Sequence, residues 1–242
     1  MIDRRSLLGL GTAAALGPGL PALQAAATNP ATPGIRRHVT LGRTGLEVSD
    51  IGFGSASSHD PDLVRHALDR GVTFFDTAES YRFGWSEEAM GDGLRGVRDR
   101  VGLSSKTKVG ARDTQEEVMA ALEGSLRRLR TDYLDIYFNH AVNNVARLQN
   151  PEWRAFTERA KEQGKIRFCG MSGHGSRLAE CLEYAIDHDL VDVVLVAHSF
   201  GQDPDFYDRL RHTFHFVALQ PQLPRALDKA KKIYGGHMGG AL

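Results

Sequence analysis

The amino-acid sequence predicts an α/β fold, a parallel (β/α)8 barrel of which about six β/α units are present. From Asp50 onward apolar strand-like runs alternate with amphipathic helices, and successive strands begin about 22 to 33 residues apart, the size of one β/α unit. Residues 191–197 are almost continuously aliphatic, as in strands buried on both faces. The pair Gly52 and Gly54 forms a strand-end turn and no dinucleotide fingerprint. A closed barrel is therefore favoured over an open sheet.

Strands and turns follow from local patterns. Residues 38–46 and 47–51 flank the turn sequence Gly42-Arg43-Thr44-Gly45, which predicts a short hairpin before the barrel. The barrel strands are expected, in chain order, at residues 50–54, 72–75, 101–104, 133–138, 166–171 and 191–197.

The helices between these strands carry recognisable start signals. Asp60 followed by Pro61 predicts an N-cap and a first helical residue, in a helix that Gly71 ends. Thr114 and Glu117 form a capping box ahead of a run with helical spacing. The remaining helices are expected at residues 86–95, from Asn150-Pro151 to Gly164, from Ser176 through Ile186, and at 223–232.

The N-terminus predicts an export signal. Arg4-Arg5 is followed by an Ala-, Gly- and Leu-rich stretch that closes at Ala25-Ala26-Ala27, a small-x-small cleavage pattern. We expect a twin-arginine signal over residues 1–27, a linker over 28–37 and one folded domain over 38–242. The mature protein would then be exported, to the periplasm; if residues 1–27 are instead an unstructured basic tail, the protein stays in the cytoplasm.

Composition argues against several classes of function. Lys+Arg and Asp+Glu are both 30, so no charge imbalance indicates nucleic acid or an anionic membrane as partner. No apolar run reaches the roughly 20 residues that a membrane span requires. The two cysteines, Cys169 and Cys181, are too few for a disulfide framework and are expected to be packed thiols. His212 and His215 lack a third ligand, so we expect no metal site.

Four polar residues follow the strands in the middle of the chain. Asp76, Lys106 and His140 each come just after an apolar run, and Tyr81 lies in the loop after the first of these runs. Active sites of parallel α/β barrels lie at the C-terminal ends of the strands. We therefore expect a carboxylate, a phenol, an amine and an imidazole to converge there.

This set of groups suits proton transfer to a carbonyl oxygen. A free phenol ionises only near pH 10, and a neighbouring ammonium favours its ionised form. Lys106 can supply that charge, Asp76 can hold the ammonium in place, and His140 can donate a hydrogen bond or relay a proton. Tyr81 would then be the general acid. Because none of the four residues is redox active, the electrons must come from a hydride donor.

The chain resembles the aldo-keto reductases, which are NADPH-dependent (β/α)8 barrels. The resemblance extends over about residues 38 to 232 and implies a small-molecule carbonyl substrate. It implies that Tyr81 is the proton donor, with Asp76, Lys106 and His140 as catalytic partners, and that Gly54, Asp76 and Ser172 contact the cofactor NADPH. The matching strings are LGRTGLEVSDIGFGS, GVTFFDTAESY, SEEAMGDGLRG, RDRVGLSSKTK, SLRRLRTDYLDIYFNH and GKIRFCGMSGH.

The chain departs from the family pattern in two places. Gly173 and Leu195 stand where the family often has Asn and Gln, so fewer side chains would recognise the carboxamide. Residues 233–242 are too glycine-rich for a seventh strand, so we expect the last two β/α units, which hold much of the cofactor in the family, to be absent. The alternative function is a catalytically silent, truncated barrel, from a degraded reading frame or serving as an association module.

Three aromatic residues near strand ends have two interpretations. Phe53, Phe83 and Trp85 could line an apolar substrate pocket, or they could be ordinary packing over the barrel mouth.

Overall fold

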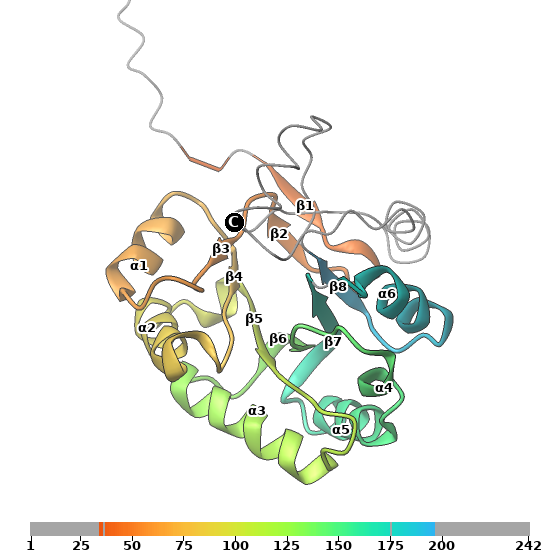
Figure 1. Ribbon diagram of the computed structural model, residues 1–242. Helices are drawn as coiled ribbons and strands as arrows, with labels where there is room; N and C mark the ends of the chain where they lie inside the picture. Colours follow the sequence, from red (N-terminus) through yellow and green to blue (C-terminus); the bar gives the residue numbers. More distant parts are fainter. Residues whose placement is uncertain (1–33, 36, 175, 197–242) are drawn as a thin grey trace, which may run out of the picture. The chain divides into compact units, whose positions relative to one another are not determined.

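Neighbouring strands of the central sheet are also neighbours in the sequence. The computed structural model describes residues 34, 35, 37–174 and 176–196 (Figure 1), all within the unit Pro33–Leu242. In this part of the chain, parallel pairing joins six strands in chain order. They are β3 (Phe53–Gly54), β4 (Phe74–Asp76), β5 (Gly102–Thr107), β6 (Leu134–Asn139), β7 (Ile166–Gly173) and β8 (Val193–Val196).

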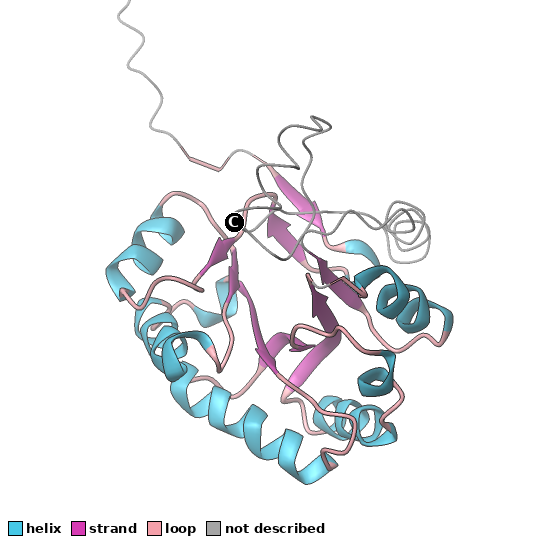
Figure 2. Ribbon diagram, viewed as in Figure 1, coloured by secondary structure: helices cyan, strands magenta, loops and turns pink. Residues whose placement is uncertain are grey.

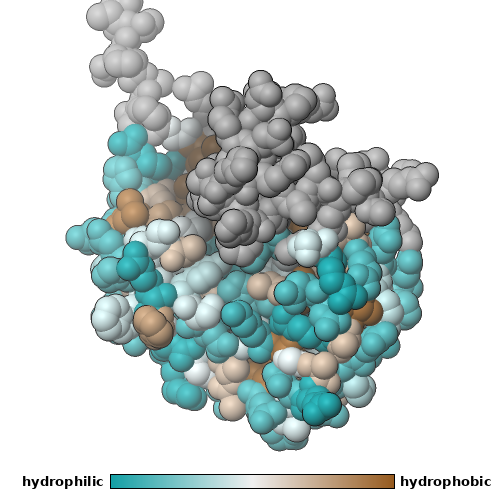
Figure 3. Space-filling model, viewed as in Figure 1, coloured by the Kyte–Doolittle hydropathy of each residue, from teal (hydrophilic) through white to brown (hydrophobic). Residues whose placement is uncertain are grey.

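The helices lie along the outer face of this sheet, as Figure 2 shows. Apolar residues of strands and helices together form the layer between them, with Phe75, Leu103 and Tyr137 packed against helix residues such as Leu122 and Phe156. In Figure 3 the outward surface of the helices is mostly hydrophilic, as expected of amphipathic helices. The helices are α1 (Pro61–Asp69), α2 (Trp85–Gly93), α3 (Gln115–Leu129), α4 (Val145–Leu148), α5 (Pro151–Glu162) and α6 (Leu178–Asp187).

Three helix starts confirm the predicted capping residues. The Asp60 side chain accepts a hydrogen bond from the Asp62 amide at 2.9 Å, and Pro61 occupies the first turn. Thr114 and Glu117 form both bonds of the capping box at the start of α3. At the start of α5 the Asn150 side chain accepts from the Glu152 amide at 3.1 Å, with Pro151 as the first residue. These signals are local, which is why the sequence displays them.

A second apolar cluster lies inside the curved sheet. It joins strand residues such as Ile136, Phe138 and Val193 to Leu46 and Val48 of the N-terminal hairpin, and none of the described residues in it belongs to a helix. The hairpin pairs β1 (His38–Thr40) with β2 (Glu47–Ser49) in antiparallel register and confirms the prediction. The sheet therefore has an outer face covered by helices and an inner face against the hairpin, as in a (β/α) barrel.

The two cysteines lie in different parts of the core, which agrees with packed thiols. Cys169 belongs to the layer under α3 and α5, and Cys181 of α6 packs with Leu178 and Met171. Both are free and buried.

Several predicted boundaries are wrong. The third predicted strand stops at residue 104, but β5 continues through Lys106 to Thr107, with all six residues buried. The first predicted strand, 50–54, is reduced to Phe53–Gly54, and β8 begins at Val193 rather than at residue 191. The short helix α4 was not predicted.

Some predictions lie outside the described residues: the signal over 1–27, most of the linker over 28–37, the pair His212 and His215, and the helix over 223–232. Among the described helices, none combines the length and the apolarity that crossing a bilayer needs. The same part of the chain holds no cluster of three metal-ligating His, Cys, Asp or Glu side chains.

Candidate active site

The four predicted residues lie at the C-terminal ends of three adjacent parallel strands. Asp76 is the last residue of β4, and His140 directly follows β6. Lys106 lies within β5, one residue before its end, and not beyond the strand as predicted. Tyr81 begins the turn Tyr81–Gly84 between β4 and α2. Parallel pairing of β4 with β5 and of β5 with β6 brings the side chains together.

Lys106 and Asp76 form a buried ion pair. Lys106 Nζ donates to Asp76 Oδ2 at 2.5 Å and to the Thr77 carbonyl oxygen at 2.7 Å. Ser104 Oγ donates to the other carboxylate oxygen, Oδ1, at 2.6 Å. The Lys106 side chain is 1% exposed, so protein groups replace water around this ammonium.

Tyr81 and His140 lie beside this pair. The Tyr81 ring centroid is 4.9 Å from Lys106 Nζ and 5.6 Å from the His140 ring, which it meets edge to face at 83°. His140 is anchored through its main chain, because its amide donates to the Thr107 carbonyl oxygen at 2.7 Å. The structure thus brings all four predicted side chains into one cluster.

His140 is held in its neutral form. Burial lowers the pKa of the imidazole to about 4, and the positive charges of Lys106, Lys108, His174 and Arg147 act in the same direction. At pH 7 this ring therefore carries one N–H donor and one acceptor nitrogen. Ser80 Oγ lies 3.4 Å from its Nδ1.

The predicted cofactor contacts border the same strand ends. Gly54 pairs with Asp76 in register and is exposed. Ser172 of β7 is buried, and its Oγ accepts a hydrogen bond from the Ala141 amide at 3.0 Å. A Cβ on Gly170 would meet the inner side chain of Phe138, so Ser172, two residues later, faces the inside of the sheet as well.

These groups suit the amide end of a nicotinamide ring, because a serine hydroxyl and a neutral imidazole both form hydrogen bonds with a carboxamide. Gly173 faces the other way: a Cβ there would lie 2.5 Å from Leu178 Cδ1 of α6. Leu195 pairs with Ser172 and packs in the inner apolar cluster. Neither Gly173 nor Leu195 adds a polar group, as the sequence indicates.

The predicted aromatic residues divide into two groups. Phe53 packs against Phe75, with 5.8 Å between ring centroids, in the layer under the helices. Of the two interpretations, this contact favours ordinary packing for Phe53, which is partly buried. Phe83 is 97% exposed and Trp85 is 59% exposed. Phe83 adopts a left-handed backbone conformation with φ of 59°, as does Arg82 before it, which is unusual for a bulky residue.

Two polar residues of the cluster have no signal in the sequence. The hydrogen bond from Ser104 to Asp76 depends on the parallel register that sets these two residues side by side on β4 and β5, which no sequence pattern marks. Arg147, on the unpredicted helix α4, donates hydrogen bonds to the loop that carries His140. Its partners are main-chain oxygens and Asn139 Oδ1, which no local motif marks, so only the tertiary structure reveals it.

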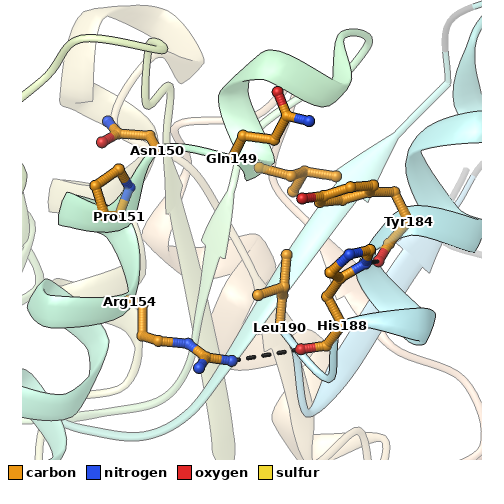
Figure 4. A pocket seen from close by; sticks show the side chains of 8 residues that line it. Gln149, Asn150, Pro151, Arg154, Tyr184, His188 and Leu190 are labelled. Carbon is orange, nitrogen blue, oxygen red and sulfur yellow. Dashed lines mark hydrogen bonds between the residues drawn. The ribbon is translucent and has the colours of Figure 1, made fainter.

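A pocket of about 280 Å³ lies elsewhere, between the start of α5 and the end of α6 (Figure 4). Tyr184 and His188 stack along one side with 3.9 Å between ring centroids, and Arg154 donates to the His188 carbonyl oxygen at 3.4 Å. None of the four clustered residues lines it, so this pocket is separate from the predicted site.

Comparison with known proteins agrees with the geometry. The model of the Aldo/keto reductase family matches residues 50–203. The aldo-keto reductase YhdN of Bacillus subtilis is 32% identical over 155 residues, which cover 56% of this chain and 46% of YhdN. The chain thus spans about half the length of this curated relative.

Solved structures give the same result. The aldo-keto reductase AKR11C1 from Bacillus halodurans, in its holo form, is 26% identical with a TM-score of 0.59, over 75% of this chain and 64% of that one. An aldo-keto reductase from Klebsiella pneumoniae in complex with NADPH is 29% identical with a TM-score of 0.55, over 74% and 65%. Because the family model covers more than half of the residues of this chain, the chain belongs to the aldo/keto reductase family.

Proposed function

We propose that this protein reduces an aldehyde or a ketone to an alcohol, with NADPH as hydride donor and Tyr81 as general acid. The observation that carries the proposal is the arrangement around Lys106. Its buried ammonium is held by Asp76 and lies 4.9 Å from the Tyr81 ring. Family membership supports the reaction class, and the NADPH complex of the Klebsiella relative supports the cofactor.

Lys106 and Asp76 prepare Tyr81 for proton donation. An ammonium has three N–H donors, and Asp76 Oδ2 and the Thr77 carbonyl oxygen accept from two different directions. The remaining N–H can be directed to the Tyr81 hydroxyl, where it stabilises the phenolate that proton transfer leaves behind. Asp76 keeps the ammonium in this position and balances its charge in the buried site.

His140 is suited to bind the carbonyl oxygen. As a neutral imidazole it donates an N–H without bringing a second positive charge beside Lys106. A hydrogen bond from His140 polarises the carbonyl group and strengthens as negative charge develops on its oxygen. Because its ring is in edge-to-face contact with Tyr81, both donors would lie on the same side of the substrate.

The cofactor would lie next to these strand ends, with Ser172 on its carboxamide and Gly54 and Asp76 beside the ring. NADPH, when bound, supplies the hydride. The carbonyl carbon gains that hydride and the oxygen gains the Tyr81 proton, so the product is the alcohol; Tyr81 then regains a proton from solvent, directly or through His140.

A steady-state assay tests this function. We expect the purified protein to oxidise NADPH in the presence of members of a broad aldehyde and ketone panel. Tyr81→Phe should reduce kcat by about 10²- to 10⁴-fold, while Tyr184→Phe, which removes a phenol on the outer helix α6, should keep the wild-type rate. Equal rates of NADPH oxidation for the wild type and Tyr81→Phe would contradict this mechanism. If the protein neither binds NADPH in calorimetry nor oxidises it with any carbonyl compound, the result would match the alternative, a catalytically silent barrel.

Residues 1–27 are further proposed to direct export through the twin-arginine machinery, which makes the periplasm the site of action. Arg4-Arg5 and the cleavage pattern at residues 25–27 support this. Cell fractionation of the wild type and of a variant with Arg4→Lys and Arg5→Lys tests it. Export should stop in the variant; equal export of both would contradict the proposal.

A further inference from the structure

Arg147 connects the ends of two strands through its guanidinium group. Nε donates to the Val109 carbonyl oxygen at 2.6 Å, just after β5. Nη1 donates to the Ala141 carbonyl oxygen at 2.8 Å, and Nη2 donates to Asn139 Oδ1 at 2.7 Å and to the His140 carbonyl oxygen at 2.9 Å. Four oxygens at the ends of β5 and β6 are thus bound by one side chain.

The short helix α4 presents this side chain. The Asn144 side chain caps the helix by accepting from the Ala146 amide at 3.0 Å, and Leu148 is buried in the core under α6. Arg147 is only partly exposed. Its planar guanidinium group holds several N–H donors in fixed directions, so it can bind four acceptors at once. The ammonium group of a lysine cannot bind all four.

The segment that these bonds hold carries His140. Ala141 adopts a left-handed backbone conformation with φ of 52°, which a residue with a Cβ rarely adopts. Its carbonyl oxygen is bound by Arg147, and its amide donates to Ser172 Oγ at 3.0 Å. The amide of His140 itself donates to the Thr107 carbonyl oxygen at 2.7 Å. The main chain at His140 and Ala141 is therefore fixed from three sides.

We infer that Arg147 is a positioning residue for His140 in carbonyl reduction: its guanidinium fixes the main chain at the end of β6 so that the imidazole stays against Tyr81. This inference rests on the proposed function, because it assigns Arg147 to the same site. Arg147 itself does not touch the reacting atoms; it acts through His140.

If Arg147 positions His140, the pKa of His140 should respond differently to substitution than if Arg147 acts through its charge alone. Arg147 is one of four positive groups around the imidazole, with Lys106 and Lys108 from β5 and the following loop and His174 after β7. Arg147→Lys keeps the positive charge but loses the planar set of N–H donors of the guanidinium group. A positioning role predicts that Arg147→Lys releases the imidazole toward solvent, so that the pKa of His140 rises from about 4 toward its ordinary 6.5. A role through charge alone predicts no change in this variant.

The experiment combines kinetics with NMR titration of ¹³C-labelled histidine rings in the full-length protein. Arg147→Lys and Arg147→Ala are compared with Arg154→Lys and Arg154→Ala, which change an exposed arginine on the outer helix α5. We expect kcat to fall by roughly 10- to 100-fold in both Arg147 variants, with KM for NADPH within about twofold of the wild type. The His140 signal should titrate at higher pH, and the Arg154 variants should match the wild type. If Arg147→Ala does not fold, Arg147→Lys alone decides.

The NMR measurement separates this inference from the proposed function. If the wild type shows no turnover, the proposed function fails, and the titration still decides whether Arg147 positions His140. A wild-type His140 titration in folded Arg147→Lys overturns the inference, whatever the rates. A shifted titration with kcat within twofold of an active wild type also overturns it, because Arg147 would then hold the loop without serving the reaction.

Discussion

Lys106 on β5 reaches the carboxylate of Asp76 on β4, with 2.5 Å between Nζ and Oδ2, although the sheet register pairs Asp76 with Ser104. The lysine side chain therefore extends back across the strand ends, under the loop that carries Tyr81. Both groups are buried. A buried ion pair of this kind is strongly coupled, because removing one charge leaves the other without compensation.

The coupling predicts a non-additive pair of substitutions. Asp76→Asn and Lys106→Met should each lower the free energy of unfolding by about 3–5 kcal/mol, since each leaves a buried charge unpaired or an acceptor unsatisfied. The double variant should be less destabilised than the sum of the two. Urea unfolding of the four proteins measures this cycle; additive effects within about 0.5 kcal/mol would contradict the buried pair.

Stability should depend on pH through His140. Its folded pKa, about 4, lies below the ordinary 6.5, so as the pH falls the unfolded chain takes up this proton before the folded chain does. The free energy of unfolding is therefore greatest above pH 6.5 and decreases between about pH 6.5 and 4, by on the order of 2 kcal/mol from this residue. Urea unfolding across this range should show a shallower decrease for His140→Gln than for the wild type. His66→Gln, at an exposed histidine of α1, serves as control; equal slopes for His140→Gln and the wild type would count against a buried neutral imidazole.

Two helix glycines should respond oppositely to alanine. A Cβ on Gly91 of α2 would lie 2.6 Å from the Leu129 carbonyl oxygen of α3, and backbone cannot move away cheaply, so Gly91→Ala should destabilise by about 1–3 kcal/mol. A Cβ on Gly124 would meet only the ends of flexible side chains, the guanidinium groups of Arg128 at 3.2 Å and of Arg127 at 3.9 Å. Gly124→Ala should be neutral or stabilise by up to about 1 kcal/mol. Thermal unfolding compares the two; a stabilised Gly91→Ala would rule out this close helix contact.

Both thiols should be inert in the folded protein. Burial raises the pKa of Cys169 to about 11, with the Asp192 carboxylate contributing, and burial likewise raises that of Cys181 to about 11. Because the thiolate is the reactive form, a chromogenic disulfide reagent at pH 7.5 should label the native protein slowly and both cysteines rapidly in urea. Fast labelling of the native protein at either position would contradict the packing.

Much of the fold could be predicted from the sequence because its signals are local. The Asp60-Pro61 and Thr114–Glu117 pairs mark helix starts through hydrogen bonds within one turn. The alternation of strands and helices then gave the parallel order. The C-terminal end of β5 could not be predicted, because the polar residues Ser105 to Thr107 suggest a loop. They continue the strand since Ser104 and Lys106 face Asp76, while Ser105 and Thr107 donate to Glu87 and Glu79 on the other side.

The residues of the candidate site likewise divide into those with a local sequence signal and those without one. Asp76, Tyr81, Lys106 and His140 were predicted because each follows a recognisable apolar run and bears a reactive group. Arg147 was not, because its function depends on carbonyl oxygens of residues 109, 140 and 141, which no sequence pattern marks. Residues with reactive side chains can be predicted from their type and their position after an apolar run. Residues that position them can be identified only from the tertiary structure.

Carbonyl reduction by NADPH with Tyr81 as proton donor is tested most directly by following the transferred hydride. The wild type is incubated with an aldehyde and NADPH deuterated at both C4 positions, and the alcohol is analysed by mass spectrometry. We expect an alcohol that carries one deuterium from the wild type and from Tyr184→Phe, and almost none from Tyr81→Phe. An alcohol without deuterium, or equal labelled product from Tyr81→Phe, would contradict it.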